Sequence, residues 1–165
     1  MVSKRSGELE RFLTALGETP EVLRQLLKDV PANRVSWKPS RNEFSLLEHI
    51  CHLRDIEIEG LAARLKRLQN EDNPNLPNID GDRLAFERDY NRQDVDSAFV
   101  AFISARTSNI ALLRFLPLED FDRPGNLERV GPVTAWKLIS LVVEHDAEHL
   151  RVIRELHSRI LNQWS

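Results

Sequence analysis

Four histidines, which occur in two pairs, are the side chains of this sequence best suited to metal chemistry. His145 and His149 lie four residues apart, and His49 and His52 lie three residues apart far upstream. Residues with these separations lie on the same side of a helix, one turn from each other. Neutral imidazole is the commonest metal ligand among side chains. Each pair can therefore contribute to a metal site, but a pair alone needs at least one further ligand.

Both downstream histidines fall on an apolar helical stripe, which is expected to face a core. Upstream, His52 precedes Leu53, a member of the apolar stripe of its own segment, so its imidazole can also point inward. The histidines are therefore expected at positions where two helices meet. The downstream stripe consists of Leu138, Leu141, Val142, Val152, Leu156 and Ile160.

A set of three histidines, His52 with His145 and His149, suits Zn²⁺, Ni²⁺ or Fe²⁺. Three protein ligands leave a coordination position open for water or substrate, as in catalytic rather than structural sites. By spacing alone His49 remains a rival to His52, because a modest rotation of the helix would exchange them. Each ligating ring is expected to donate its other N–H to an acceptor. The nearest acids by helical spacing are Glu48, Asp55, Glu59 and Glu148.

Two other metal chemistries fit less well. The residues from His145 to His149 match the H-x-x-E-H pattern of inverted zinc proteases, with Glu148 as the glutamate. Only sixteen residues follow, however, and Glu155 is the only acid among them. Di-iron bundles use Glu-x-x-His pairs on two helices. None of the four clustered histidines has a glutamate three residues before it.

Arg106 falls on an apolar stripe with Phe102 and Ile110. A buried guanidinium needs a partner. Asp55, Glu57 or Glu59 would provide one, as would an anionic substrate. The alternative is an arginine whose head group extends to solvent at the edge of the fold. Separately, Cys51 is the only cysteine, and it points about 100° away from His52 on a helix, so it is not expected to join the same ion.

Helical apolar spacing continues along the whole chain, which predicts an all-α fold. Residues 17–20 interrupt the first amphipathic segment, where Thr19 and Pro20 are a favourable N-cap and first residue for a restarted helix. The sequence is compatible with two helices or with one kinked helix there. A second helix is expected over residues 45 to about 69. It begins with a capping box of Ser45 and Glu48, and Phe44 before it can pack onto the first turn.

The rest of the chain predicts a short helix within residues 82–90, a third long helix from Asp94 or Asp96 to near Pro117, and a last helix from Thr134 to about Asn162. Residues 70–81 and 119–132 contain prolines and glycines and are expected to be loops. Four long amphipathic segments predict a four-helix bundle with long connections, in a single domain over residues 1–165.

Composition narrows the function class. The formal net charge is −3 and both signs are mixed along the chain, so there is no electrostatic support for nucleic-acid binding. Apolar runs are only a few residues long, and residues 1–5 lead into a charged segment rather than a signal peptide. No association with a membrane is expected, and with one cysteine the expected location is the cytoplasm.

Two motifs resemble those of the DinB-like (DinB/YfiT-like) superfamily of metal-binding four-helix bundles. The front motif is a tryptophan and a proline followed by an S…E…HL.D.E pattern, present here as Trp37, Pro39 and the run EFSLLEHICHLRDIE over residues 43–57. The back motif is HD..H on the last helix, present in the run VEHDAEHL over residues 143–150. The resemblance covers nearly the whole chain in order and spacing.

The resemblance implies that His52, rather than His49, binds a divalent metal together with His145 and His149, in a cavity near the end of the bundle. It also implies frequent homodimers. Members with known activity include thiol-dependent S-transferases and a mycothiol-dependent maleylpyruvate isomerase, and others were proposed as metal-dependent hydrolases. The superfamily name refers to DNA-damage induction and does not imply DNA binding.

The expected function is that of a divalent-metal enzyme of the S-transferase or hydrolase type, acting on a small-molecule substrate. The ion would lower the pKa of a bound water or of a low-molecular-weight thiol. Asp55 or Glu48 would orient a ligand or relay a proton, and Arg106 would hold an anionic group. The alternative is a non-catalytic bundle that dimerises or binds a partner, with a structural or vestigial metal; a fourth protein ligand on the ion would favour it.

Overall fold

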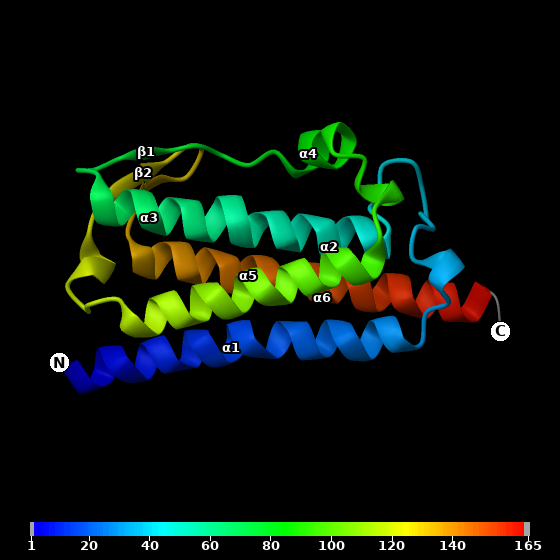
Figure 1. Cartoon of the computed structure of the whole chain (residues 1–165), viewed down its shortest axis with the longest axis horizontal. Helices are drawn as coiled ribbons and strands as arrows, with labels where there is room; N and C mark the ends of the chain where they lie inside the picture. The colour runs from blue at the N-terminus through cyan, green and yellow to red at the C-terminus, as the bar shows by residue number, and fades with distance from the viewer. Residues whose placement is uncertain (1, 164–165) are drawn as a thin grey trace.

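The computed structural model describes residues 2–163 and contains four long helical stretches (Figure 1). In Figure 1, the first and last stretches run from left to right and the other two run in the opposite direction. The predicted all-α four-helix bundle is therefore confirmed. Met1, which belongs to the N-terminal segment considered above, and residues 164–165 lie outside the described residues. The four stretches are α1 (Val2–Lys28); α2 (Leu46–Asp55) continued by a π-helical segment (Ile56–Ala62) and α3 (Ala63–Asn70); α5 (Val95–Phe115); and α6 (Ala135–Gln163).

The first stretch is one helix, with Pro20 inside it. The prediction of Thr19 as the N-cap of a restarted helix is wrong. Its side chain is buried and its hydroxyl donates a hydrogen bond to Asp146 Oδ2 on α6, at 2.7 Å. The hydrogen bond to Asp146 and the packing of α1 on α5 and α6 therefore outweigh the local preference for a helix break. Intrinsic helix propensity is a weak preference that tertiary contacts can override.

The predicted starts of the other helices agree with the structure. Both hydrogen bonds of the capping box between Ser45 and Glu48 are present at the start of α2. Phe44 packs edge-on against His49 in the first turn, with ring centroids 5.5 Å apart, in the arrangement of a hydrophobic staple. Asp94 rather than Asp96 caps α5, since its carboxylate accepts a hydrogen bond from the third residue of the helix.

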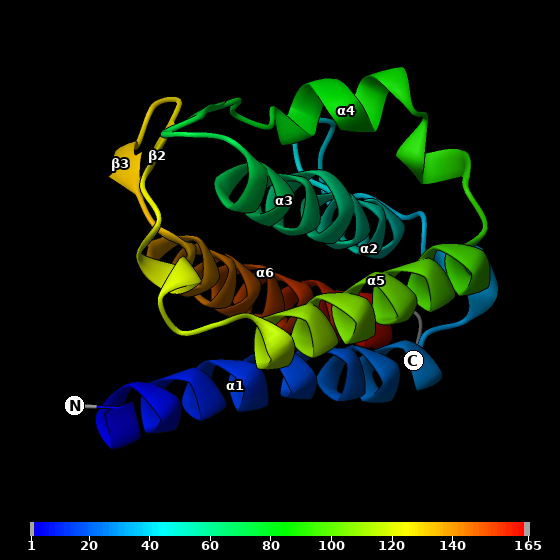
Figure 2. The same ribbon diagram turned by 60° about the vertical axis from the view of Figure 1, so that its left-hand side comes forward.

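The two segments expected to be loops pair with each other in a small sheet, which the sequence did not predict (Figure 2). β1 (Asn75–Leu76) runs parallel to β2 (Gly125–Leu127), and β2 pairs antiparallel with β3 (Gly131–Val133). Strands of two or three residues are too short to show an alternating pattern. The expected short helix is present as α4 (Gly81–Glu87), followed by a 3₁₀ turn (Tyr90–Arg92). Figure 2 shows α4 lying over α2.

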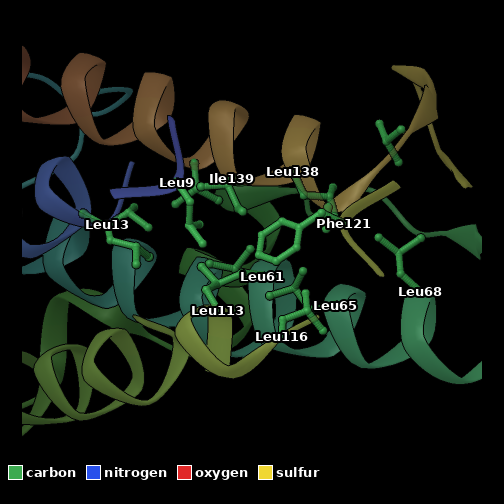
Figure 3. Close-up of a cluster of buried hydrophobic side chains, with 14 of the residues drawn as sticks. Leu9, Leu13, Leu61, Leu65, Leu68, Leu113, Leu116, Phe121, Leu138 and Ile139 are labelled. Atoms are coloured by element: carbon green, nitrogen blue, oxygen red, sulfur yellow. The ribbon is translucent and has the colours of Figure 1, made fainter. Parts of the chain in front are cut away.

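Two separate apolar clusters form the core. The first lies toward the beginning of α1, where α3, the end of α5 and the beginning of α6 meet it (Figure 3). The second joins the end of α1 to α2, the beginning of α5 and the end of α6. Large members of the second cluster include Leu23, Leu46, Ile50, Leu53, Tyr90, Phe102, Ile153, Leu156 and Ile160.

Between the two clusters each helical stretch carries buried polar side chains. In α1, for example, Leu16 belongs to the first cluster, Leu23 to the second, and the buried Thr19 lies between them. In the other three stretches, too, buried polar residues separate the residues of the first cluster from those of the second. A layer of buried polar side chains, here called the polar level, therefore crosses the bundle between the two apolar clusters. The other buried polar residues of this level are Asp55, Glu57, Arg106, Asn109 and Asp146.

Among residues 2–163, α5 is the one helix long and apolar enough to cross a membrane, judged by length and composition alone. It packs against α1, α2 and the π-helical segment, and it carries the buried Arg106 and Asn109.

Candidate metal centre

Four histidine rings meet between α2 and α6. His52 Nε2 lies 3.0 Å from His145 Nε2, and His49 Nδ1 lies 2.8 Å from His149 Nδ1. One nitrogen from each of His52, His145 and His149 can be chosen so that all three lie within 4.8 Å of one another. The structure therefore brings together the three histidines that the resemblance selects. His52 lies in the second turn of α2, and His145 and His149 lie near the middle of α6.

Local structure holds the His52 ring from two sides. Phe44, fixed in the staple, packs edge-on against this ring with centroids 5.9 Å apart. On another side the backbone of Gly81, at the start of α4, approaches so closely that a Cβ there would lie 2.7 Å from His52 Cε1. Only glycine fits this position without displacing the ring or the helix. The long connection after α3 thus helps to position the ring.

Burial keeps these histidines neutral. Desolvation, followed by the neighbouring imidazoles, lowers the pKa of His145 to about 2 and that of His49 to about 3. Desolvation is also the main reason that the pKa of His52 falls to about 4, and it lowers the pKa of His149. At neutral pH each ring therefore keeps a free lone pair, which is the form that binds a metal ion.

Several ring nitrogens have no protein partner. Nδ1 of His52 and Nδ1 of His145 are buried and make no hydrogen bond to the part of the chain that the structure describes. A buried nitrogen without a partner carries a free-energy penalty. Nε2 of His52 and Nε2 of His145 face each other, and no carboxylate of residues 2–163 hydrogen-bonds to either of them. Three neutral imidazoles converging from two helices form a donor set that fits Zn²⁺, Ni²⁺ or Fe²⁺.

The prediction that nearby acids accept hydrogen bonds from these rings is wrong for all four candidates. Helical spacing identified acids near the histidines, but cationic side chains pair with all four of them instead. Lys38 and Arg88 come from other parts of the fold, whereas Arg54 and Arg151 lie on the same helices as their partners. Sequence spacing could not place Lys38 or Arg88 against α2. The contacts observed are Glu48 with Lys38 and the Ser45 amide; Asp55 with Arg54, Arg88 and the Tyr90 hydroxyl; Glu59 with Arg88; and Glu148 with Arg151.

Arg106 is 1% exposed and forms ion pairs within the protein. Its guanidinium lies 2.9 Å from Glu57 Oε1 and 2.7 Å from Asp146 Oδ2, and it donates a hydrogen bond to the Leu16 carbonyl at 2.7 Å. The expectation of Glu57 as a partner is confirmed, whereas the arginine extending to solvent is wrong. Burial alone lowers the pKa of Arg106, but the two carboxylates outweigh this effect and the pKa is raised.

Asp146, which sequence reasoning missed, connects this ionic cluster to the histidines. It lies on α6 between His145 and His149 in sequence and also accepts a hydrogen bond from Thr19. Asn109 donates to the carboxylate of Glu57 at 2.8 Å. The cluster therefore joins α1, the π-helical segment, α5 and α6 directly beside the histidines. The sequence did contain a signal for this role, because Asp146 is an acidic residue between two histidines on an apolar helical stripe.

A sequence profile of the DinB superfamily matches residues 15–153. The chain belongs to the DinB superfamily. Among solved structures it is similar to YfiT from Bacillus subtilis, described as a probable metal-dependent hydrolase with an unusual four-helix bundle topology: the TM-score is 0.83 at 21% identity, over 95% of this chain and 89% of that one. A DinB-like protein, YjoA, from Bacillus subtilis gives a TM-score of 0.62 at 18% identity, over 91% and 92%. No curated protein matches the chain.

The histidine cluster of this DinB-superfamily chain is not sealed. His145 and His149 are half-buried, whereas His49 and His52 are buried. A cavity of about 270 Å³ also reaches His49, and its wall includes Phe44 and Leu156. A larger cavity of about 710 Å³ also borders Phe44 and is lined by Glu48. Of the four histidines, His49 is the one that lines either of these two cavities, so a small molecule can approach the cluster from the side of this ring.

Proposed function

We propose that this chain is a metal-dependent hydrolase that binds one divalent ion through His52, His145 and His149. The observation that carries the proposal is the convergence of three neutral imidazole nitrogens from α2 and α6 within 4.8 Å. An ion held there would supply a Lewis acid able to generate a nucleophile near neutral pH. The description of YfiT as a probable metal-dependent hydrolase supports the same reaction class.

The other polar residues expected at the site act in this proposal by positioning. Asp55 accepts hydrogen bonds from Arg88, at the end of α4, and from Tyr90 after it. These contacts fix α4 on α2 and so keep Gly81 against the His52 ring. Glu48 fixes the start of α2 through the capping box. Arg106 holds α6 against its neighbours through Asp146 rather than holding an anionic group of the substrate.

The substrate in this proposal is a small molecule that enters beside Phe44, where the two cavities adjoin. Use of a low-molecular-weight thiol, as in the related S-transferases, is the second reaction type to be tested. A homodimer in the cytoplasm remains the expected state of the protein. The half-buried histidines on α6 favour an enzyme over a bundle with a purely structural metal, since structural sites are closed by a fourth protein ligand.

The test compares hydrolysis of a panel of chromogenic esters and amides by the full chain, with and without a chelator and with and without added thiols. We expect metal-dependent turnover that does not need a thiol. His145→Leu should abolish it, whereas His157→Leu, which removes a histidine two helical turns beyond His149, should retain it. Turnover only with a thiol would assign the transferase reaction. Equal rates in the chelated and metal-loaded protein would contradict both.

A further inference from the structure

His49 occupies a place in the cluster that the three-ligand site does not explain. It lies on α2 one turn before His52, is buried, and contacts His149 through the Nδ1 atoms of both rings at 2.8 Å. It is not part of the group of three whose nitrogens lie within 4.8 Å of one another. The ring centroids of His49 and His149 are 5.0 Å apart and the planes are nearly perpendicular, at 77°. This edge-to-face geometry joins the two rings through a single nitrogen–nitrogen contact.

The contact determines which nitrogen of His149 remains for an ion. Because Nδ1 of His149 faces His49, Nε2 is the nitrogen left for the ion. The other two histidines also present Nε2, since these atoms of His52 and His145 face each other while both Nδ1 atoms are buried without a partner. A ring that binds an ion through Nε2 carries its proton on Nδ1. His149 Nδ1–H would then donate to His49 Nδ1, and the remaining proton of His49 would be on Nε2.

Metal-binding histidines normally donate this second N–H to a carboxylate, a backbone carbonyl or water, which fixes the ring and its tautomer. The acid nearest to His149 in sequence, Glu148, instead pairs with Arg151. We propose that His49 is the positioning residue that takes this role: it accepts the Nδ1–H of His149 and so fixes the His149 ring for the ion. This inference rests on the proposed function, because it assigns a role toward the same metal ion.

The surroundings of His49 are consistent with a fixed acceptor. The ring sits in the first turn of α2, where the capping box holds the backbone, and Phe44 packs against it. The His49 ring is therefore held in place by the capped backbone of α2 and by Phe44. Its Nε2 is buried without a partner in the described part of the chain, and the ring borders the cavity of about 270 Å³. His149 is therefore the hydrogen-bond partner of His49 Nδ1.

The test uses two matched substitutions. His49→Asn keeps an acceptor oxygen close to the Nδ1 position, whereas His49→Leu keeps similar bulk without an acceptor. Zinc affinity is measured by competition with a chromogenic chelator, with His157→Leu as a histidine-removal control. We expect His49→Leu to bind zinc about 10–100-fold more weakly than the original protein, in line with the loss of an outer hydrogen bond. His49→Asn and His157→Leu should stay within about threefold of it.

A second readout separates this role from a general packing effect. In zinc-loaded protein, ¹⁵N NMR of the imidazole rings should show His149 protonated on Nδ1 and His49 protonated on Nε2. The His149 Nδ1–H signal should be protected from exchange, and it should lose that protection in His49→Leu but not in His49→Asn.

Equal loss of zinc in both His49 variants, or an His49 Nδ1 bound to the ion, would overturn the positioning role and make His49 a ligand. Unchanged affinity in His49→Leu would also overturn it. In either case zinc binding by the original protein would leave the proposed metal site standing. A protein that binds no zinc at all would instead defeat the proposed function itself.

Discussion

Two buried polar clusters lie side by side at the middle level of this bundle, and they differ in which charges they bring together. In the first, the guanidinium of Arg106 meets the carboxylates of Glu57 and Asp146 at 2.9 and 2.7 Å. In the second, the rings of four histidines meet one another, and two nitrogens face each other at 3.0 Å. The first cluster contains both signs of charge. The second brings together neutral imidazole rings, which are electron-pair donors.

This difference assigns different roles to the two clusters. Opposite charges joined by ion pairs and hydrogen bonds form a cross-link between helices, so Arg106 acts on the structure. Some of its buried atoms, such as Nε of Arg106 and Oδ1 of Asp146, still make no hydrogen bond to the described part of the chain. Converging neutral imidazoles gain little from one another, and burial makes their protonation unfavourable. A divalent ion would bind the lone pairs of these rings, which burial keeps unprotonated. Asp146 lies between the two proposed ligands on α6, so the ionic cluster sets the position of the helix that carries part of the proposed metal site.

The largest effect on stability is expected from breaking the ionic cluster. Arg106→Met leaves Glu57 and Asp146 buried without their cation, which should lower the free energy of unfolding by about 3–5 kcal/mol. Urea unfolding of the metal-free protein measures this value. The matched control is Arg151→Met, because Arg151 is exposed and pairs with Glu148 and Glu155.

Exposed pairs contribute little, so the control should change stability by about 0.5 kcal/mol or less. The comparison becomes sharper with His145→Leu in the same metal-free assay. His145→Leu removes an imidazole whose Nδ1 has no partner, but it also takes away the contact of His52 Nε2, so it should cost about 1–3 kcal/mol, less than Arg106→Met. If Arg106→Met were as mild as the control, the distinction between the two clusters would be lost.

A smaller effect is expected where the start of α4 touches the His52 ring of the proposed metal site. Gly81→Ala places a Cβ 2.7 Å from the His52 ring, and overpacking of this kind costs about 1–3 kcal/mol. If the strain moves the ring, zinc affinity should fall about tenfold, which corresponds to 1.4 kcal/mol. Gly17→Ala is the control, because a Cβ there meets nothing within 4 Å. As a helical Gly→Ala change, it should be neutral or stabilising by about 0.5–1 kcal/mol. Equal zinc affinity in the two alanine variants would show that Gly81 does not position the His52 ring.

The pH dependence of the metal-free protein tests the burial of the histidine cluster in small steps. Folding lowers the pKa of His52 to about 4 and that of His145 to about 2, so below about pH 6.5 the unfolded chain binds more protons than the folded chain. The free energy of unfolding should therefore decrease as the pH falls from about 6.5 toward 4. Each such histidine adds about 1.4 kcal/mol per pH unit to this slope.

Urea unfolding between pH 4.5 and 7 in the presence of a chelator, at a set of pH values, measures the slope. His145→Leu should reduce it by about the contribution of one histidine. A slope identical to that of the original protein would mean that this ring is not buried in the neutral form.

Much of the fold follows from local sequence signals. The capping box at Ser45, the cap at Asp94 and the apolar stripes locate α2, α5 and α6, because these signals act within one or two helical turns. Thr19 shows the limit: its hydroxyl bonds to Asp146, 127 residues away, and the local signal for a helix start was misleading. The small sheet was missed for a related reason, since β1 pairs with β2 from the other connection and all three strands are very short.

The candidate site shows the same division. Spacing and family motifs identified His52, His145 and His149, since helical periodicity places side chains on faces. The main partners of Glu48, Asp55 and Glu59 could not be predicted, because Lys38 and Arg88 reach α2 and the π-helical segment from a connection and from the end of α4. The pair of Glu148 with Arg151, three residues later on α6, does follow from helical spacing. The contact between His49 and His149 was also missed. It depends on how α2 packs against α6, which spacing along one helix does not contain.

Metal analysis of the full chain purified without an affinity tag tests the central claim most directly. We expect about one equivalent of zinc, nickel or iron per chain, retained through gel filtration and absent from His145→Leu. A folded protein that contains no such metal and takes up none on addition of these ions, or a His145→Leu variant with the same metal content as the original, would contradict it.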